Sequence, residues 1–167
     1  MNLIEYHSYF EIIATQLLNH TESTPKFVRT SRVEFDNGSI EAISTGVKSK
    51  LNFTTPILVS IDYTGYISNN YVENRRDYRN ASFALLIQKK DKEELNQYVD
   101  LEEIAKKKII KKLYEDWRKA MNSGDKQYEF VRGFDLNQIN YDQLRGGFDN
   151  NLIGWVFNFQ IHEKIGF

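Results

Sequence analysis

The segment 153–162 constrains the fold of this chain most, because it alternates large apolar side chains with mostly polar ones. A period of two places Trp155, Phe157 and Phe159 on one face of a β-strand, and Ile161 continues the same face. The carboxyl-terminal segment is therefore predicted to carry part of the hydrophobic core.

Composition bounds the size and the class of the protein. A chain of 167 residues fits one compact domain over 1–167, because a chain of this size buries roughly two-thirds of its unfolded surface. Its 22 Lys and Arg residues balance 23 Asp and Glu residues, so the net charge of −1 gives no global attraction to DNA or to an anionic membrane. The absence of cysteine excludes disulfides, thiolate metal sites and a cysteine nucleophile.

Signals of export and membrane insertion are missing from the sequence. Residues 1–7 contain no basic segment followed by an apolar stretch, and no apolar run approaches the ~20 residues needed to span a bilayer. We therefore expect a soluble protein that is not exported and that has no membrane partner.

Two amphipathic helices are predicted from apolar spacing. The first covers about 3–19, where the apolar positions at helical intervals are Tyr6, Phe10, Ile13 and Leu17. The second covers 100–121, where Asp100 is a good cap with Glu103 three residues later. The apolar residues of this second helix follow two arcs, so its packing partner changes along its length or the helix bends.

The remaining segments predict strands and turns. A first strand is expected over 27–35, followed by a hairpin turn at Asn37-Gly38. This register places three pairs opposite each other, namely Phe35 with Ile40, Val33 with Ala42, and Glu34 with Glu41. Further strands are expected over 57–63, over 83–87 with both faces covered, and over 128–131 ahead of an irregular segment through Gly147.

Residues 64–80 lack sustained periodicity and are predicted to form a long loop excursion, a feature that is uncommon unless functional or disordered. Together, these elements predict an α+β domain, with a mainly antiparallel sheet and the two amphipathic helices packed on it.

Metal sites find little support in the sequence. His7, His20 and His162 lie far apart and outside any metal-binding motif. The acidic group of Glu34, Asp36 and Glu41 would suit calcium or magnesium, but the calcium-loop pattern is missing, so a solvated turn balanced by nearby lysines is the favoured explanation. We expect no metal and no cofactor.

A lysine-rich arc on the second predicted helix is a candidate nucleic-acid surface. Its members are Lys107, Lys108, Lys111, Lys112, Arg118 and Lys119. Such a stripe can contact phosphate oxygens, although surface helices of ordinary domains often carry lysine faces. A nucleic-acid-binding or regulatory module therefore stays open as an alternative.

Loop residues of the types that anchor protein interfaces are better candidates for specific contacts. These interface candidates are Tyr66, Tyr71, Arg75, Arg76, Tyr78 and Arg145. The sequence contains no nucleophile elbow, phosphate loop or dinucleotide-binding glycine pattern, so we expect no enzyme. A small enzyme whose carboxylates converge only in the fold remains a second alternative.

The order of predicted elements resembles the small neck and tail-completion proteins of tailed bacteriophages, and most nearly the tail terminators. The resemblance covers most of the chain as architecture and includes the aromatic strand after Asn151-Leu152-Ile153-Gly154-Trp155. It implies a subunit that forms a ring with other copies of itself, contacts portal, neck or tail-tube proteins, and meets DNA only in transit. It also implies a place in the virion after assembly in the host cytoplasm, and it carries over no catalytic residue.

Overall fold

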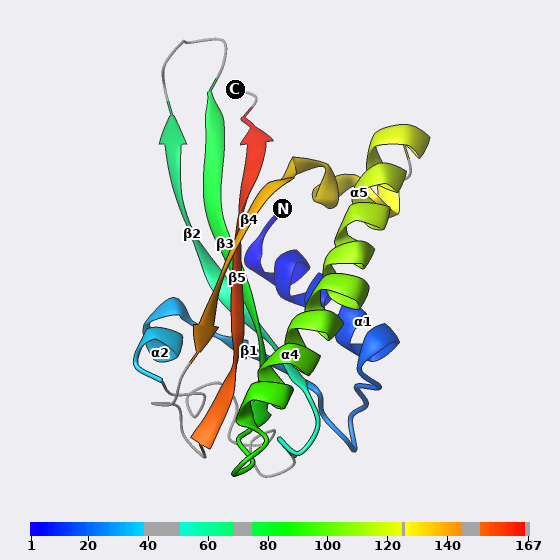
Figure 1. Ribbon diagram of the computed structural model, residues 1–167. Helices are drawn as coiled ribbons and strands as arrows, with labels where there is room; N and C mark the ends of the chain where they lie inside the picture. The colour runs from blue at the N-terminus through cyan, green and yellow to red at the C-terminus, as the bar shows by residue number, and fades with distance from the viewer. Residues whose placement is uncertain (39–50, 69–74, 125, 145–150, 166–167) are drawn as a thin grey trace.

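A five-stranded mixed sheet forms the centre of the molecule in the computed structural model, which describes residues 1–38, 51–68, 75–124, 126–144 and 151–165 (Figure 1). The strand order is β1-β2-β3-β5-β4, with β1 parallel to β2 and every other neighbouring pair antiparallel. The strands are β1 (Phe27–Thr30), β2 (Ile57–Ser68), β3 (Arg76–Gln88), β4 (Phe134–Leu144) and β5 (Leu152–Lys164). The predicted α+β fold with a mainly antiparallel sheet is confirmed.

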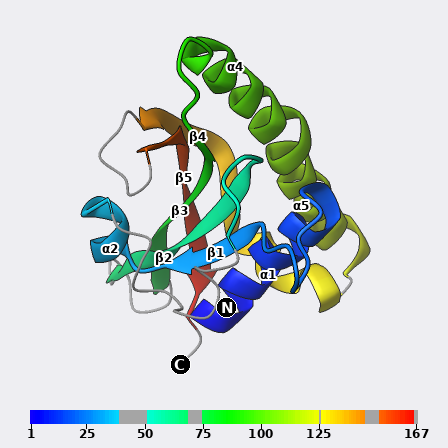
Figure 2. The same ribbon diagram turned by 90° about the horizontal axis from the view of Figure 1, so that it is seen from below.

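Helices of very different length lie on the two faces of this sheet (Figure 2). One face is covered by α1 (Leu3–Leu17) and by the continuous helical run of α4 (Glu94–Ile104), the π-helix η1 (Ala105–Ile110) and α5 (Lys111–Ser123). The short α2 (Arg32–Asp36) lies on the other face. The two long helices predicted from apolar spacing therefore both pack on the sheet.

The main core lies between the sheet and the long helices. Phe83 of β3 pairs with Phe157 of β5, and their rings stack with centroids 5.0 Å apart. Phe10 of α1 lies against Phe83 at 5.3 Å, and all three rings are fully buried. Phe159 and Ile161 extend the same face, so the prediction that the carboxyl-terminal strand carries core is confirmed.

A second core lies on the opposite face, beneath α2. Ala84 and Leu86 of β3 pack there with Val59 of β2 and with Phe35 of α2. Since Phe83 and Leu85 belong to the main core, the predicted strand over 83–87 is covered on both faces.

The predicted strand over 27–35 is wrong beyond residue 30. Ser31 caps α2 instead, with its Oγ accepting from the Glu34 N–H at 3.2 Å, and Val33 and Phe35 become helical. Gly38 has a φ of 72°, a left-handed conformation that ends a helix as readily as it turns a hairpin. The predicted partners Ile40, Glu41 and Ala42 lie outside the described residues.

The predicted loop excursion over 64–80 is wrong in most of its length. β2 continues to Ser68 and β3 begins at Arg76, so the two strands form a long hairpin arm. Residues 64–67 of β2 are exposed and their partners in β3 are exposed or half-buried, so strand pairing there needs no alternation of apolar and polar residues.

The second long helix begins at Glu94 rather than at Asp100. The buried side chain of Gln97 fixes its first turn, accepting from the Lys90 N–H and donating to the Gln88 carbonyl, both at 2.9 Å. The helix ends at Ser123, two residues beyond the predicted end, and Gly124 follows with a φ of 62°. The two apolar arcs of the predicted second helix meet at η1. The turns of this π-helix are wider than those of an α-helix, so residues four apart stay on one face.

The segment before the last strand also differs from its prediction. Residues Lys126–Gly133 form the 3₁₀ helix η2 rather than a strand, and β4 follows where an irregular segment was expected. A register shift between Asp135 and Asn140 interrupts the alternation in β4 and hides its strand pattern.

Candidate interaction surface

The face of the sheet that points away from α1 changes from apolar to polar along β3. Near α2 it carries Ala84 and Leu86, and toward the start of the strand it carries Ser82, Asn80 and Tyr78. We define the open face by six residues of β2, β3 and β5: Tyr66, Tyr78, Asn80, Asn158, Gln160 and His162. Tyr66, Asn80 and Gln160 are exposed and the other three are half-buried.

A row of aromatic rings crosses three strands on the open face. Tyr66 pairs with Tyr78, and their rings stack at 5.2 Å with an interplanar angle of 14°. Tyr78 also pairs with His162, whose ring meets it edge-on at 4.7 Å. These cross-strand contacts hold the arm in register where its side chains are largely exposed.

A shallow polar cavity of about 450 Å³ lies next to this aromatic row. Arg32 Nη2 donates to Ser82 Oγ at 2.6 Å, and Ser82 Oγ donates to Asn158 Oδ1 at the same distance. Most of the other lining side chains are amides, namely Asn80, Gln138, Asn140 and Gln160, and Asp135 is the one carboxylate among the lining residues. This lining offers hydrogen bonds without paired carboxylates for acid–base chemistry.

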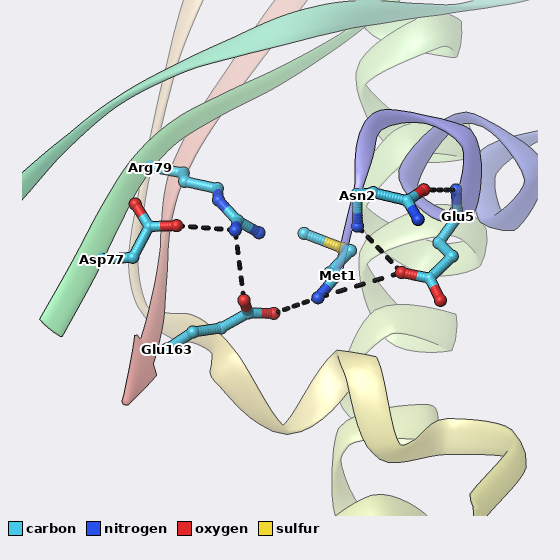
Figure 3. A network of polar contacts seen from close by, with 6 residues as sticks. All are labelled: Met1, Asn2, Glu5, Asp77, Arg79 and Glu163. Carbon is cyan, nitrogen blue, oxygen red and sulfur yellow. Dashed lines mark hydrogen bonds and ion pairs between the residues drawn. The ribbon is translucent and has the colours of Figure 1, made fainter. Parts of the chain in front are cut away.

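The opposite side of the arm is tied to the start of α1 by an ionic network (Figure 3). Arg79 Nη2 lies 2.6 Å from Asp77 Oδ2 and 3.2 Å from Glu163 Oε2, and its guanidinium stacks over Tyr63. Glu163 Oε1 in turn accepts from the Met1 amino group at 2.9 Å. The base of the arm is thus fixed to both β5 and α1.

The structure brings together three of the six interface candidates. Tyr66, Tyr78 and Arg76 lie on the arm, with Tyr66 and Arg76 exposed, and Arg75 directly precedes β3. Tyr71 and Arg145 lie outside the described residues. The other four candidates were predicted to lie in a loop. Tyr66, Arg76 and Tyr78 belong to paired strands instead, and Arg75 lies next to one.

The lysine-rich arc is partly neutralised by carboxylates one helical turn away. Lys107 pairs with Glu103 at 3.0 Å, Lys111 with Glu115 at 3.9 Å, and Lys112 with the buried Asp116 at 2.8 Å. Lys108, Arg118 and Lys119 form no ion pair with any residue that the structure describes. Three of the six basic side chains of the arc therefore already have an acidic partner. Fewer of them are left to bind a nucleic-acid phosphate than the sequence suggested.

A hydrogen-bonded relay of Ser60, His7 and Asp62 was missed from the sequence, with Ser60 and His7 buried and Asp62 half-buried. His7 Nδ1 lies 2.7 Å from Ser60 Oγ, and His7 Nε2 lies 2.6 Å from Asp62 Oδ1. Burial lowers the pKa of His7, while the bond to Asp62 opposes that shift. The Ser60 side chain is completely buried, so the relay joins α1 to β2 and presents no nucleophile at the surface.

The structure also bears on the metal-site hypotheses. Within the described ranges, no three His, Cys, Asp or Glu side chains gather closely enough to hold a metal ion. Glu34 and Asp36 belong to α2, and their predicted partner Glu41 is outside those ranges. The helices of the same ranges include none long and apolar enough to cross a membrane.

Comparison with known proteins yields no assignment. No known protein-family profile matches the chain, and no curated protein sequence matches it at a significant level.

Proposed function

We propose that this protein is a structural subunit that assembles with copies of itself into a ring at the neck or tail of a phage-like particle, in the manner of a tail terminator. Its partners would be neighbouring copies and portal, neck or tail-tube proteins, with DNA passing in transit. Assembly would take place in the host cytoplasm and the finished protein would reside in the virion.

The observation that carries this proposal is the projecting arm of β2 and β3. The ends of these strands stand apart from α1 and α5 (Figure 1), and Tyr66 and Ile67 expose 55% and 57% of their surface there. Paired strands hold these side chains in place, so a partner would bind them without paying for the ordering of a loop. Exposed aromatic and apolar side chains on a rigid support are typical of interface anchors.

A ring also requires two different surfaces on each subunit, because successive copies meet through heterologous contacts. The open face, with Tyr66 of the arm, provides one such surface on the side of the sheet away from the long helices, and Ile67 points to the opposite side of the arm. The long helices provide others, since α4 exposes Leu95 and Val99 on its outer side.

The proposal is tested by examining the full chain alone and with isolated tail tubes or portal complexes. Light scattering and negative-stain electron microscopy should show rings of one subunit number, or attachment at one end of the tube. A strict monomer that binds none of these partners would contradict the proposal.

A further inference from the structure

The end of the arm concentrates positive charge beside apolar surface. We define the arm end by Tyr66, Ile67, Arg76 and Lys164, all of them exposed. Arg76 begins β3, Lys164 ends β5, and the two are direct cross-strand partners. Neither forms an ion pair with a described residue. Like charges placed directly opposite each other destabilise a sheet, and a carboxylate from a partner would relieve that repulsion.

A groove of complementary character is lined by residues of α4 and by Ile87 of β3. Figure 1 shows α4 at the opposite end of the molecule from the arm end. It has a volume of about 260 Å³, and Ile87, Leu101 and Ile104 supply its apolar lining. Glu93 and Asp100 stand on its rim with exposed side chains, and neither forms an ion pair with a described residue. We call this feature the α4 groove.

Acidic side chains outnumber basic ones in the lining of the α4 groove. Glu93 and Asp100 line it together with one lysine, Lys90. The other carboxylates of α4 outside the groove are paired with lysines, namely Glu94 with Lys89, Glu102 with Lys106 and Glu103 with Lys107. The excess of acid at the groove therefore comes from Glu93 and Asp100, the counterpart of Arg76 and Lys164 at the arm end.

We infer that the arm end of one copy docks in the α4 groove of the next copy, with Arg76 and Lys164 facing Glu93 and Asp100. This inference rests on the proposed self-assembly and names the two surfaces that carry it. Tyr66, which shares a face of the sheet with Arg76 and Lys164, would cover the apolar floor, while the charge pairs fix orientation and suppress contacts between like surfaces. Because the two surfaces differ, the contact repeats from copy to copy and closes into a ring where the rotation allows.

Charge reversal on each side tests this contact. The arm variant carries Arg76→Glu and Lys164→Glu, and the groove variant carries Glu93→Lys and Asp100→Lys. Sedimentation velocity of the full chain over a concentration series should show each variant associating at least about 100-fold more weakly than the wild type, because like charges then face each other. All four positions are exposed, and circular dichroism checks that each variant folds.

Two restorations separate this contact from a general effect of charge. An equal mixture of the arm and groove variants should assemble again, because each reversed surface finds an opposite charge on the other protein. The fourfold variant should also assemble by itself, with both partners of the contact reversed. A control carrying Arg118→Glu and Lys119→Glu makes the same change in charge on α5 and should associate like the wild type.

The outcomes also distinguish the docking contact from the proposed function. If the wild type assembles and the reversed variants assemble equally well, or if the mixture fails to restore assembly, the contact is overturned while the ring proposal stands. Open filaments that respond to the charge reversals would support the contact and contradict the ring. A wild type that stays monomeric at every concentration and binds neither tail tubes nor portal complexes would overturn both.

Discussion

At the scale of single residues, Gly154 shows how closely two strands of the sheet approach each other. A Cβ added at this position would lie 1.9 Å from the Leu85 carbonyl oxygen and 2.9 Å from its carbon. Both atoms belong to the backbone of β3, so relief requires strand movement. Glycine is therefore required before Trp155, because any side chain at this position would clash with the backbone of β3.

Gly154→Ala is expected to lower the free energy of unfolding by about 3 kcal/mol, because the added methyl group forces β5 away from β3. Urea denaturation measures this change. Gly124→Asn is the matched control, since nothing lies within 4 Å of that position and Asn tolerates its positive φ, and we expect it to cost less than about 1 kcal/mol. Equal losses in the two variants would refute the steric explanation.

His7 predicts how stability depends on pH. Its pKa is lowered in the folded protein, chiefly by burial, so the unfolded chain binds a proton more readily than the folded one. The contribution of His7 is therefore complete above the unfolded pKa of about 6.5 and is lost as the pH falls toward the lower folded pKa. Urea midpoints measured between pH 5 and pH 8 should rise with pH.

His7→Gln removes the titrating group and should flatten this dependence. A variant with the same slope as the wild type would show that other groups cause it. Neither the histidine nor its partners could be predicted from the sequence, because Ser60 and Asp62 lie 53 and 55 residues away and come together only through the packing of α1 on β2.

At the scale of elements, a buried polar contact joins α1 to α5. Tyr9 Oη donates to Asp116 Oδ2 at 2.7 Å, Lys112 lies against the other carboxylate oxygen at 2.8 Å, and Asp116 is 1% exposed. Burial raises the pKa of the Tyr9 hydroxyl, which keeps it a donor. Tyr9 thereby provides a hydrogen bond to a carboxylate that has lost its water.

Tyr9→Phe is expected to destabilise the protein by about 2 kcal/mol, because it leaves that buried carboxylate with one donor fewer. Tyr66→Phe removes an exposed hydroxyl and should change the unfolding free energy by less than about 0.5 kcal/mol. Thermal and urea denaturation of the pair measure the difference. A loss as small for Tyr9→Phe as for Tyr66→Phe would mean that the contact adds no stability.

The lysine-rich arc on η1 and α5 makes a separate prediction. Because Lys107, Lys111 and Lys112 already have acidic partners, we expect weak duplex binding that disappears at physiological salt. Filter binding with Lys108→Glu, Lys111→Glu and Lys119→Glu combined tests it. Strong binding by the wild type that this triple variant loses would favour a nucleic-acid-binding module instead.

Elements with a buried apolar stripe were predictable, and elements with another source of order were not. Apolar spacing located α1, β5 and the two-sided core of β3, because each buries large side chains. The arm was not predicted because its order comes from backbone pairing. The helix α2 was not predicted because its five residues depend on the Ser31 cap. The register shift in β4 broke the alternation that identifies a strand, whereas the π-turns of η1 only divided the apolar stripe of a helix that was still predicted.

At the scale of the whole molecule, the candidate surfaces were predicted only in part. The residue types Tyr66, Tyr78 and Arg76 indicated an interface, but their common position on one arm depends on the pairing of β2, β3 and β5. The α4 groove had no sequence signal, since Ile87 reaches it from β3 while Glu93 and Asp100 come from the helix and its start. Surfaces that several elements build together become visible only in the fold.

We propose that this protein acts by assembling with copies of itself through unlike surfaces. Sedimentation velocity of the full chain, from micromolar concentration upward and with isolated tail tubes or portal complexes, measures whether this assembly occurs. A ring gives one closed species whose mass is a fixed multiple of the monomer and does not grow with concentration. A chain that stays monomeric throughout this range and binds neither partner would contradict ring assembly.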